Sequence, residues 1–318
     1  MATLRVGMQI HPQATTVDEM RAAWHRADEL GADSIWTWDH FYPLYGDPDA
    51  PHFEGWTLLS VMAADTSRAK LGMLVTGNTY RNPTLLAKVL TALDVVSGGR
   101  AQLGIGAGWF ELEHDALGYE FGTFTDRFEK LEEALQIILP MLRDENPTFS
   151  GKHYSVTNAI NHPAPISRIP IMIGGSGEKK TLRMVAQYAD ESNLTSSPDE
   201  LPRKLEVLAE HCEAVGRDRS EITMSQHCNV VIAPTHEQAF EEFADALAVR
   251  GMDLRGGDEG LRDMILGMVI LGDPDEVGER LTAIMAKGAQ GLTMSAPANG
   301  FVPGRVELLG EVASKVVA

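Results

Sequence analysis

Short apolar runs rich in β-branched residues alternate with longer segments of helical periodicity along this 318-residue chain. Runs of the first kind indicate buried strands, and their alternation with helices is typical of a parallel sheet built from strand–helix units. Eight runs predict strands, at Leu4–Ile10, Asp33–Trp38, Leu71–Val75, Ala101–Gly106, Ile169–Ile173, Glu191–Thr195, Ile222–Ile232 and Gly291–Ser295.

Eight strands with intervening helices predict an α/β fold, a (β/α)8 TIM barrel, which typically takes about 250 residues. The surplus length is expected in loop insertions at the carboxyl-terminal face. Three segments rich in Pro, Gly, Asn or Asp are candidates, namely Tyr42–Gly55, Asp144–Ser167 and Val249–Gly267. No internal repeat suggests a second domain, so we expect residues 1–318 to form a single TIM-barrel domain.

The net charge of the chain limits the kinds of partner that it can bind. A formal net charge of -18 opposes nonspecific contact with nucleic acid or an anionic membrane surface. No stretch reaches the roughly 18 apolar residues of a membrane span, and the amino-terminal residues lack the pattern of a signal peptide. The two cysteines, Cys212 and Cys228, have no metal-type spacing, which suits a reducing compartment. We therefore expect a cytoplasmic protein without nucleic-acid or membrane partners.

Polar residues and glycines follow six of the predicted strands. Because a TIM barrel carries its chemistry at the carboxyl ends of its strands, these positions predict a small-molecule site. The segments are His11–Gln13, Asp39–His40, Thr76–Asn78, Ala107–Trp109, Gly174–Gly177 and Thr195–Ser196.

The run Gly174–Gly177 precedes a predicted helix that starts at Lys179. Backbone amides and the helix dipole at such a position favour an anion, so this run predicts a phosphate cradle. The alternative is a flexible turn with Ser176 as a helix N-cap.

Gly104–Trp109 resembles a dinucleotide fingerprint at first sight. Trp109 takes the place of its last glycine, and no acidic residue ends a clear second strand about 20 residues later, so we reject that interpretation. Gly106 and Gly108 would instead let the backbone pass beneath a flat ring. A tight strand-to-helix turn whose glycines serve packing alone is the alternative.

Asp39 and His40 place a carboxylate beside an imidazole at a strand end. An imidazole exchanges protons near neutral pH, and a nearby carboxylate can orient a ligand or adjust that exchange. The alternative is an N-capping aspartate followed by an ordinary loop histidine.

Taken together, these motifs resemble the bacterial luciferase-like flavin and deazaflavin oxidoreductases, and most closely the branch that uses coenzyme F420. The similarity runs through nearly the whole chain. It rests on Asp39–His40, Leu74–Pro83, Ser97–Arg100, Leu103–Trp109, Ile173–Gly177 and Gly272–Val277.

The resemblance implies a TIM barrel that holds a tricyclic cofactor at its carboxyl end, with a non-proline cis peptide at Leu74–Val75 or one residue later. It implies that His40 donates or accepts the catalytic proton, and it assigns no metal ligands. The cofactor-binding residues that it implies are Asp39 at the ring or ribityl chain, Leu74, Val75, Thr76, Gly77 and Asn78 as a bulge behind the ring, Ala107, Gly108 and Trp109 as a wall, Gly174, Gly175, Ser176 and Gly177 as the phosphate cradle, and Thr195.

The function that follows is hydride transfer between coenzyme F420 and a small organic substrate, in a homodimer by family analogy. An FMN-dependent luciferase-like monooxygenase is the alternative. Compared with the sugar-phosphate-oxidising members of the family, the chain has Leu44 in place of a tryptophan and Trp109 in place of an acid, which weighs against sugar-phosphate oxidation. Glu111, Glu113 and His114 could supply an acid nearby.

Two remote alternatives belong to other classes. A metal-dependent barrel hydrolase would use His11, Asp39 and His40, although the paired-histidine motif expected of such an enzyme is absent from the first strand. A non-catalytic protein that only binds the cofactor is the other.

Overall fold

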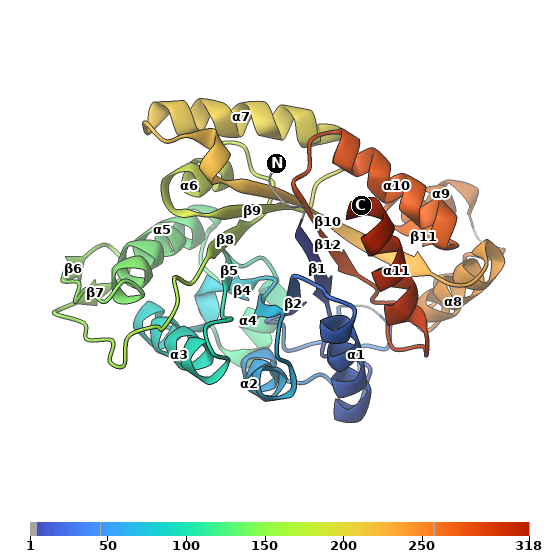
Figure 1. Ribbon diagram of the computed structural model, residues 1–318, viewed down its shortest axis with the longest axis horizontal. Coiled ribbons are helices and arrows are strands. Elements are labelled where there is room, and N and C mark those ends of the chain that lie inside the picture. Colours follow the sequence, from blue (N-terminus) through green and yellow to red (C-terminus); the bar gives the residue numbers. More distant parts are fainter. Residues whose placement is uncertain (1–4, 45, 257, 318) are drawn as a thin grey trace.

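The computed structural model describes residues 5–44, 46–256 and 258–317. A parallel sheet curls into a nearly closed barrel, and helices surround it (Figure 1). Its strands follow the order β3 (Lys70–Met73), β2 (Ser34–Thr37), β1 (Arg5–Gln9), β12 (Gly291–Ser295), β10 (Thr223–Ile232), β9 (Glu191–Leu194), β8 (Ile171–Gly174), β5 (Leu103–Gly106) and β4 (Thr76–Gly77). A bridge between Leu71 and Ala101 joins the β3 and β5 sides of the sheet. The predicted TIM barrel is therefore confirmed.

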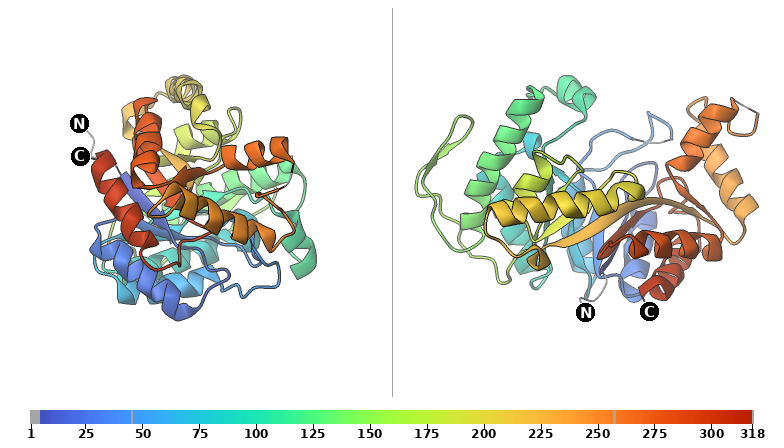
Figure 2. Two further views of the ribbon diagram at one scale, coloured as in Figure 1. Left: turned by 90° about the vertical axis from the view of Figure 1, so that its right-hand side faces the viewer. Right: turned by 90° about the horizontal axis from the view of Figure 1, so that it is seen from above.

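Helices follow most strands and cover the outside of the barrel (Figure 2). They are α1 (Val17–Glu29), α2 (Gly55–Asp65), α3 (Pro83–Val96), α4 (Glu111–Leu117), α5 (Phe124–Met141), α6 (Thr181–Tyr188), α7 (Leu201–Ala214), α8 (His236–Ala248), α9 (Glu259–Gly267), α10 (Pro274–Ala286) and α11 (Arg305–Val317). Shorter elements are the 3-10 turns η1 (Asn78–Tyr80), η2 (Pro198–Glu200) and η3 (Arg219–Glu221), the hairpin of β6 (Phe149–Ser150) with β7 (Ser155–Val156), and β11 (Ile270–Gly272) beside β10.

Local sequence signals account for several helix starts. Thr16 with Glu19, Thr123 with Asp126, and Asp273 with Glu276 form capping boxes at α1, α5 and α10. In such a box the two side chains satisfy backbone amides that the helix itself leaves unpaired. No helix in the part of the chain that the structure describes is both long and apolar enough to cross a membrane.

Some sequence predictions were wrong in detail. The strand predicted at Leu71–Val75 ends at Met73 as β3, and Leu74 and Val75 form a turn before β4. Elements α4, α9 and β11 were not predicted. Helix α9 begins inside the expected loop Val249–Gly267, where the Asp258 side chain caps it by accepting a hydrogen bond from the Leu261 amide. The segment 144–167 links the end of α5 to the start of β8, which places it at the amino-terminal end of the barrel.

Glycines leave room for Trp36 inside the barrel. A Cβ atom on Gly7 would lie 2.7 Å from Trp36 Nε1, and one on Gly72 would lie 2.8 Å from Trp36 Cζ3. On Gly104 it would meet the Met73 carbonyl oxygen at 2.1 Å as well as the indole at 3.2 Å. The 1 % exposed indole is thus enclosed by three strands and fills the barrel interior.

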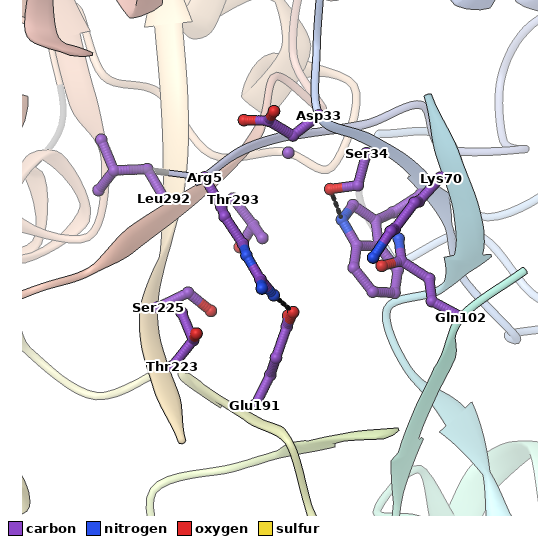
Figure 3. Close-up of a pocket in the computed structure, with 12 residues that line it drawn as sticks. Arg5, Asp33, Ser34, Lys70, Gln102, Glu191, Thr223, Ser225, Leu292 and Thr293 are labelled. Carbon is purple, nitrogen blue, oxygen red and sulfur yellow. Dashed lines mark hydrogen bonds and ion pairs between the residues drawn. The ribbon is translucent and has the colours of Figure 1, made fainter. Parts of the chain in front are cut away.

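A cavity of about 230 Å³, which Trp36 helps to line, lies at the amino ends of the strands (Figure 3). Charged side chains line it, among them Arg5, which forms an ion pair with Glu191, and also Asp33 and Lys70. This cavity is at the end of the barrel opposite to the predicted site.

Candidate active site at the carboxyl ends of the strands

The partly exposed His40 is paired with the buried Glu113. His40 follows β2, and α4 carries Glu113, whose carboxylate Oε2 lies 3.0 Å from His40 Nδ1. A carboxylate accepts hydrogen bonds, so the proton on this imidazole is held at Nδ1 and the lone pair at Nε2 stays available. The arrangement suits a group that takes a proton from a substrate.

Glu113 has no exposed side-chain surface and is held by three further donors. The Tyr80 hydroxyl donates to Oε2 at 2.6 Å, and the amides of Phe41 and Tyr42 donate to Oε1 at 2.6 and 2.8 Å. Burial alone would raise the pKa of Glu113, but the hydrogen bonds from His40, Tyr80 and the Tyr42 amide outweigh it and hold that pKa below its ordinary value. Burial and the bond to Glu113 raise the pKa of Tyr80, so its hydroxyl remains a donor.

Asp39 points to a different partner, Arg81. The guanidinium donates to both carboxylate oxygens, at 2.5 and 2.8 Å, and the Gly77 amide donates to Oδ2 at 3.1 Å. Arg81 also bonds to Glu54 at 3.2 Å. The bidentate pair ties the end of β2 to the residue after η1, and the Gly77 amide ties it to β4, so Asp39 positions the bulge segment through the backbone of Gly77.

The segment Leu74–Asn78 crosses the barrel mouth, and its Leu74–Val75 peptide bond is cis, as the family resemblance implies. The Val75 side chain packs between two other strands. A Cβ atom on Gly106 would lie 3.0 Å from Val75 Cγ2, and one on Gly174 would lie 2.8 Å from Val75 Cγ1. Val75 therefore brings β4, β5 and β8 together at this end.

The predicted wall, Ala107, Gly108 and Trp109, follows β5. Gly108 has a φ of +84°, and a Cβ there would meet Thr79 Oγ1 at 2.7 Å, so glycine is required. Thr79 Oγ1 in turn lies 2.7 Å from His114 Nε2, which fixes α4 against η1. Trp109 is 64 % exposed and its ring stands edge-on to His40 at 5.4 Å.

The predicted phosphate cradle joins the ends of β8 and β9. Ser176 Oγ accepts hydrogen bonds from the amides of Thr195 at 3.0 Å and Ser196 at 2.9 Å. The prediction that the helix starts at Lys179 was wrong, because residues 178–180 form a turn and α6 begins at Thr181. Ser176 is therefore not an N-cap. Gly175, with a φ of +123°, lets the chain turn between the two strand ends.

The metal-hydrolase alternative is not supported by this geometry. Both oxygens of Asp39 are engaged by Arg81, and His40 Nδ1 by Glu113. Among the described residues, the ligand atoms of Asp126, Glu129 and His153 are the ones that come within 4.8 Å of one another, and the Lys152 ammonium already bonds to both carboxylates there.

Sequence reasoning missed Arg81 and Tyr80 and left Glu113 as one of three candidate acids. Glu113 lies on the first turn of α4, where an acidic residue commonly serves the helix dipole alone. One sequence signal was available. Two adjacent residues, Glu113 and His114, bond to two adjacent residues of one turn, Tyr80 and Thr79, so the two pairs of neighbours could have been matched.

Comparison with known proteins gives consistent matches. The family model described as luciferase-like monooxygenase matches residues 1–291. An F420-dependent glucose-6-phosphate dehydrogenase of Microbacterium testaceum is 29 % identical over 312 residues, which cover 92 % of each chain. Among solved structures, an F420-dependent secondary alcohol dehydrogenase in complex with an F420–acetone adduct has a TM-score of 0.83, with 19 % identity and 99 % of both chains covered. The monooxygenase RslO1 from Streptomyces bottropensis has a TM-score of 0.78, with 17 % identity, 99 % of this chain and all of that one covered. At these identities the two structures establish the fold.

Proposed function

Because the chain belongs to the luciferase-like monooxygenase family, we propose that it is an oxidoreductase that transfers a hydride between coenzyme F420 and a small organic substrate. The curated sequence relatives that match nearly the whole chain are named as F420-dependent enzymes, and this observation carries the choice of cofactor. The residues at the carboxyl end of the barrel support it.

The geometry of this end fits a flat ring with an anionic tail. Gly106 and Gly174 carry no side chain on either side of Val75, so backbone and a single branched side chain form one surface. We propose that Leu74, Val75, Thr76, Gly77 and Asn78 back the ring, as the family resemblance implies. Backbone amides of Gly174–Gly177 and the neighbouring Thr195 would hold the phosphate, next to the start of α6.

His40 supplies the proton chemistry in this proposal. Glu113 holds Nδ1–H, so Nε2 can accept the hydroxyl proton of an alcohol or return it to a carbonyl. The buried carboxylate also stabilises the imidazolium that forms, as an orienting acid does in a catalytic triad. When bound, a deazaflavin accepts or gives up a hydride, and it lacks the ring nitrogen that supports oxygen activation by FMN.

A titration of the apo-protein tests the cofactor. Oxidised coenzyme F420 and FMN are added separately, and tryptophan fluorescence and visible absorbance are followed. We expect saturable binding of coenzyme F420, with FMN at least about tenfold weaker, because a single well-placed contact is worth that factor. Tight binding of FMN without binding of coenzyme F420 would overturn the proposal in favour of the monooxygenase alternative.

We also infer that residues 1–318 act as one domain, in a cytoplasmic homodimer. Family analogy supports the dimer, and light scattering of the purified protein tests it. Cys212 and Cys228 are both buried and free, which is compatible with a reducing compartment. Fractionation of cells that express the protein tests its location.

A further inference from the structure

Two aromatic rings form an exposed platform beside His40. Trp109 stacks on Phe110, with centroids 5.0 Å apart and 21° between the planes. Both rings stand edge-on to the His40 imidazole, at 5.4 and 5.6 Å. With 64 % of its surface exposed, Trp109 presents an apolar face to whatever approaches His40. We call the pair Trp109 and Phe110 the aromatic platform.

Two arginines near this platform, Arg127 and Arg250, donate hydrogen bonds to backbone carbonyls. Arg127 donates to the carbonyls of Gly108 and Gly122, and its guanidinium lies 3.8 Å over the Phe121 ring. Arg250 donates to the carbonyls of Pro43 and Gly46 in the loop that follows His40. Each guanidinium keeps its charge, but it is held at these carbonyls, where it fixes the loops.

The third arginine, Arg81, is neutralised by Asp39 and Glu54. The buried Glu113 carboxylate adds a negative charge directly behind His40. A phosphate dianion next to His40 would therefore meet a carboxylate without gaining an uncommitted guanidinium among the residues described around the platform.

The neighbouring histidine adds no positive charge. Trp38 Nε1 donates to His52 Nε2 at 3.0 Å, so this imidazole accepts a hydrogen bond and is neutral. Burial, the largest cause, lowers the pKa of His52 to about 4, which is consistent with that role. The rings around His40 are thus uncharged and largely apolar.

We propose that the substrate is an uncharged alcohol, or the corresponding ketone, whose apolar and preferably aromatic part lies against the platform. A sugar phosphate, the substrate in the name of the Microbacterium testaceum relative, does not suit these surroundings. This inference rests on the proposed function for its redox step. In oxidation the carbon that bears the hydroxyl gives its hydride to coenzyme F420, the hydroxyl proton goes to His40 Nε2, and a C=O bond forms; reduction reverses both transfers.

Direct binding measurements test the inference separately from turnover. 1-Phenylethanol and glucose 6-phosphate are titrated into the protein and into its complex with coenzyme F420 by calorimetry. We expect 1-phenylethanol to bind at least about tenfold more tightly than glucose 6-phosphate. The reverse order would overturn the inference, whereas failure of coenzyme F420 to bind would overturn the proposed function and leave the ligand preference measurable on the protein alone.

Variants of the platform give a second readout. We expect Trp109→Ala to raise the Kd and KM for 1-phenylethanol about tenfold, the size of a lost aromatic contact, and Trp109→Phe to restore most of the affinity. The control is Ile166→Ala, which removes an exposed apolar side chain from the segment between α5 and β8 at the other end of the barrel. Unchanged binding in Trp109→Ala would contradict the role of the platform. A dimeric wild type and a monomeric Trp109→Ala would do the same, by assigning the indole to a subunit interface.

Discussion

His40 Nδ1 and Glu113 Oε2 lie 3.0 Å apart although 73 positions separate the two residues in the chain. His40 lies in the loop that follows β2, and Glu113 lies on α4, a short helix that follows β5. The contact determines which nitrogen of His40 carries the proton, and therefore what a change at Glu113 does.

We expect Glu113→Gln to lower turnover about 100-fold. The Phe41 and Tyr42 amides would hold the Gln carbonyl at the position of Oε1, so its NH2 would face His40 Nδ1 and move the imidazole proton to Nε2. Tyr80→Phe keeps the carboxylate and should cost less than about tenfold. Equal losses in both variants would argue for a purely structural role of Glu113.

His40→Ala should reduce kcat by about 10²- to 10⁴-fold, the usual contribution of a general acid or base. The Kd for coenzyme F420, measured by fluorescence titration, should stay within about twofold, because the contacts proposed for the ring and phosphate come from other segments. Full turnover in this variant would remove His40 from the proton chemistry.

Ser176→Ala should weaken the binding of coenzyme F420 about tenfold. The substitution leaves the amides of Thr195 and Ser196 without the hydroxyl that now joins the two strand ends, so the proposed cradle loses its fixed shape. Titration calorimetry provides the measurement. Ser314→Ala, which removes an exposed hydroxyl that bonds within α11, is the matched control and should bind like the wild type.

Gly104→Ala should lower the free energy of unfolding by about 3 kcal/mol or more, because its Cβ would meet the Met73 carbonyl oxygen at 2.1 Å. Gly278→Ala in α10 has ordinary contacts, the nearest at 3.7 Å, and should stabilise the protein by about 0.5–1 kcal/mol. Urea unfolding compares the two variants. A Gly104→Ala protein as stable as Gly278→Ala would show that the barrel can widen at this point.

Stability should fall as the pH drops below about 6.5, in part because of His11. Burial lowers the pKa of His11 to about 4, below its ordinary value of 6.5, so between these values the unfolded chain binds a proton that the folded protein excludes. Between pH 7.5 and pH 5, the protonation of His11 in the unfolded chain lowers the free energy of unfolding by about 2 kcal/mol. His11→Phe keeps the ring between Trp38 and Phe301 without titrating, and its unfolding free energy should fall by about 2 kcal/mol less over the same range. Identical slopes for the two proteins would contradict the assignment.

The barrel could be predicted from the sequence for a physical reason, and the same reason underlies the proposed place of the site. Buried parallel strands are continuous apolar runs, and the polar residues that follow them, such as Asp39 and the run Gly174–Gly177, must gather at one end. Both signals are local, so each can be read without knowing which strands are neighbours.

The partnerships within the site could not be predicted in the same way. Whether Asp39 meets His40 or Arg81, and whether Glu113 faces solvent or His40, depends on side-chain directions in segments that are distant in sequence. The turn at residues 178–180 carries residues that are as compatible with a helix as those that follow, so the sequence leaves the start of α6 open between Lys179 and Thr181. The hydrophobic pattern and the helix propensity of a segment do not show which distant side chain it meets, or whether a turn precedes its helix.

The enclosed indole of Trp36 separates the charged cavity at the amino ends of the strands from the rings around His40 at the carboxyl ends. Three glycines, on β1, β3 and β5, lie against the Trp36 indole. The charged cavity is on one side of this indole, and Trp38, two residues further along the chain, is on the other. Residues of the rim around His40 therefore have no direct contact with the ion pair of Arg5 with Glu191. A barrel divided in this way is a practical starting point for directed evolution. Libraries restricted to the carboxyl end around His40 leave the charged amino end, and its contribution to folding, unchanged.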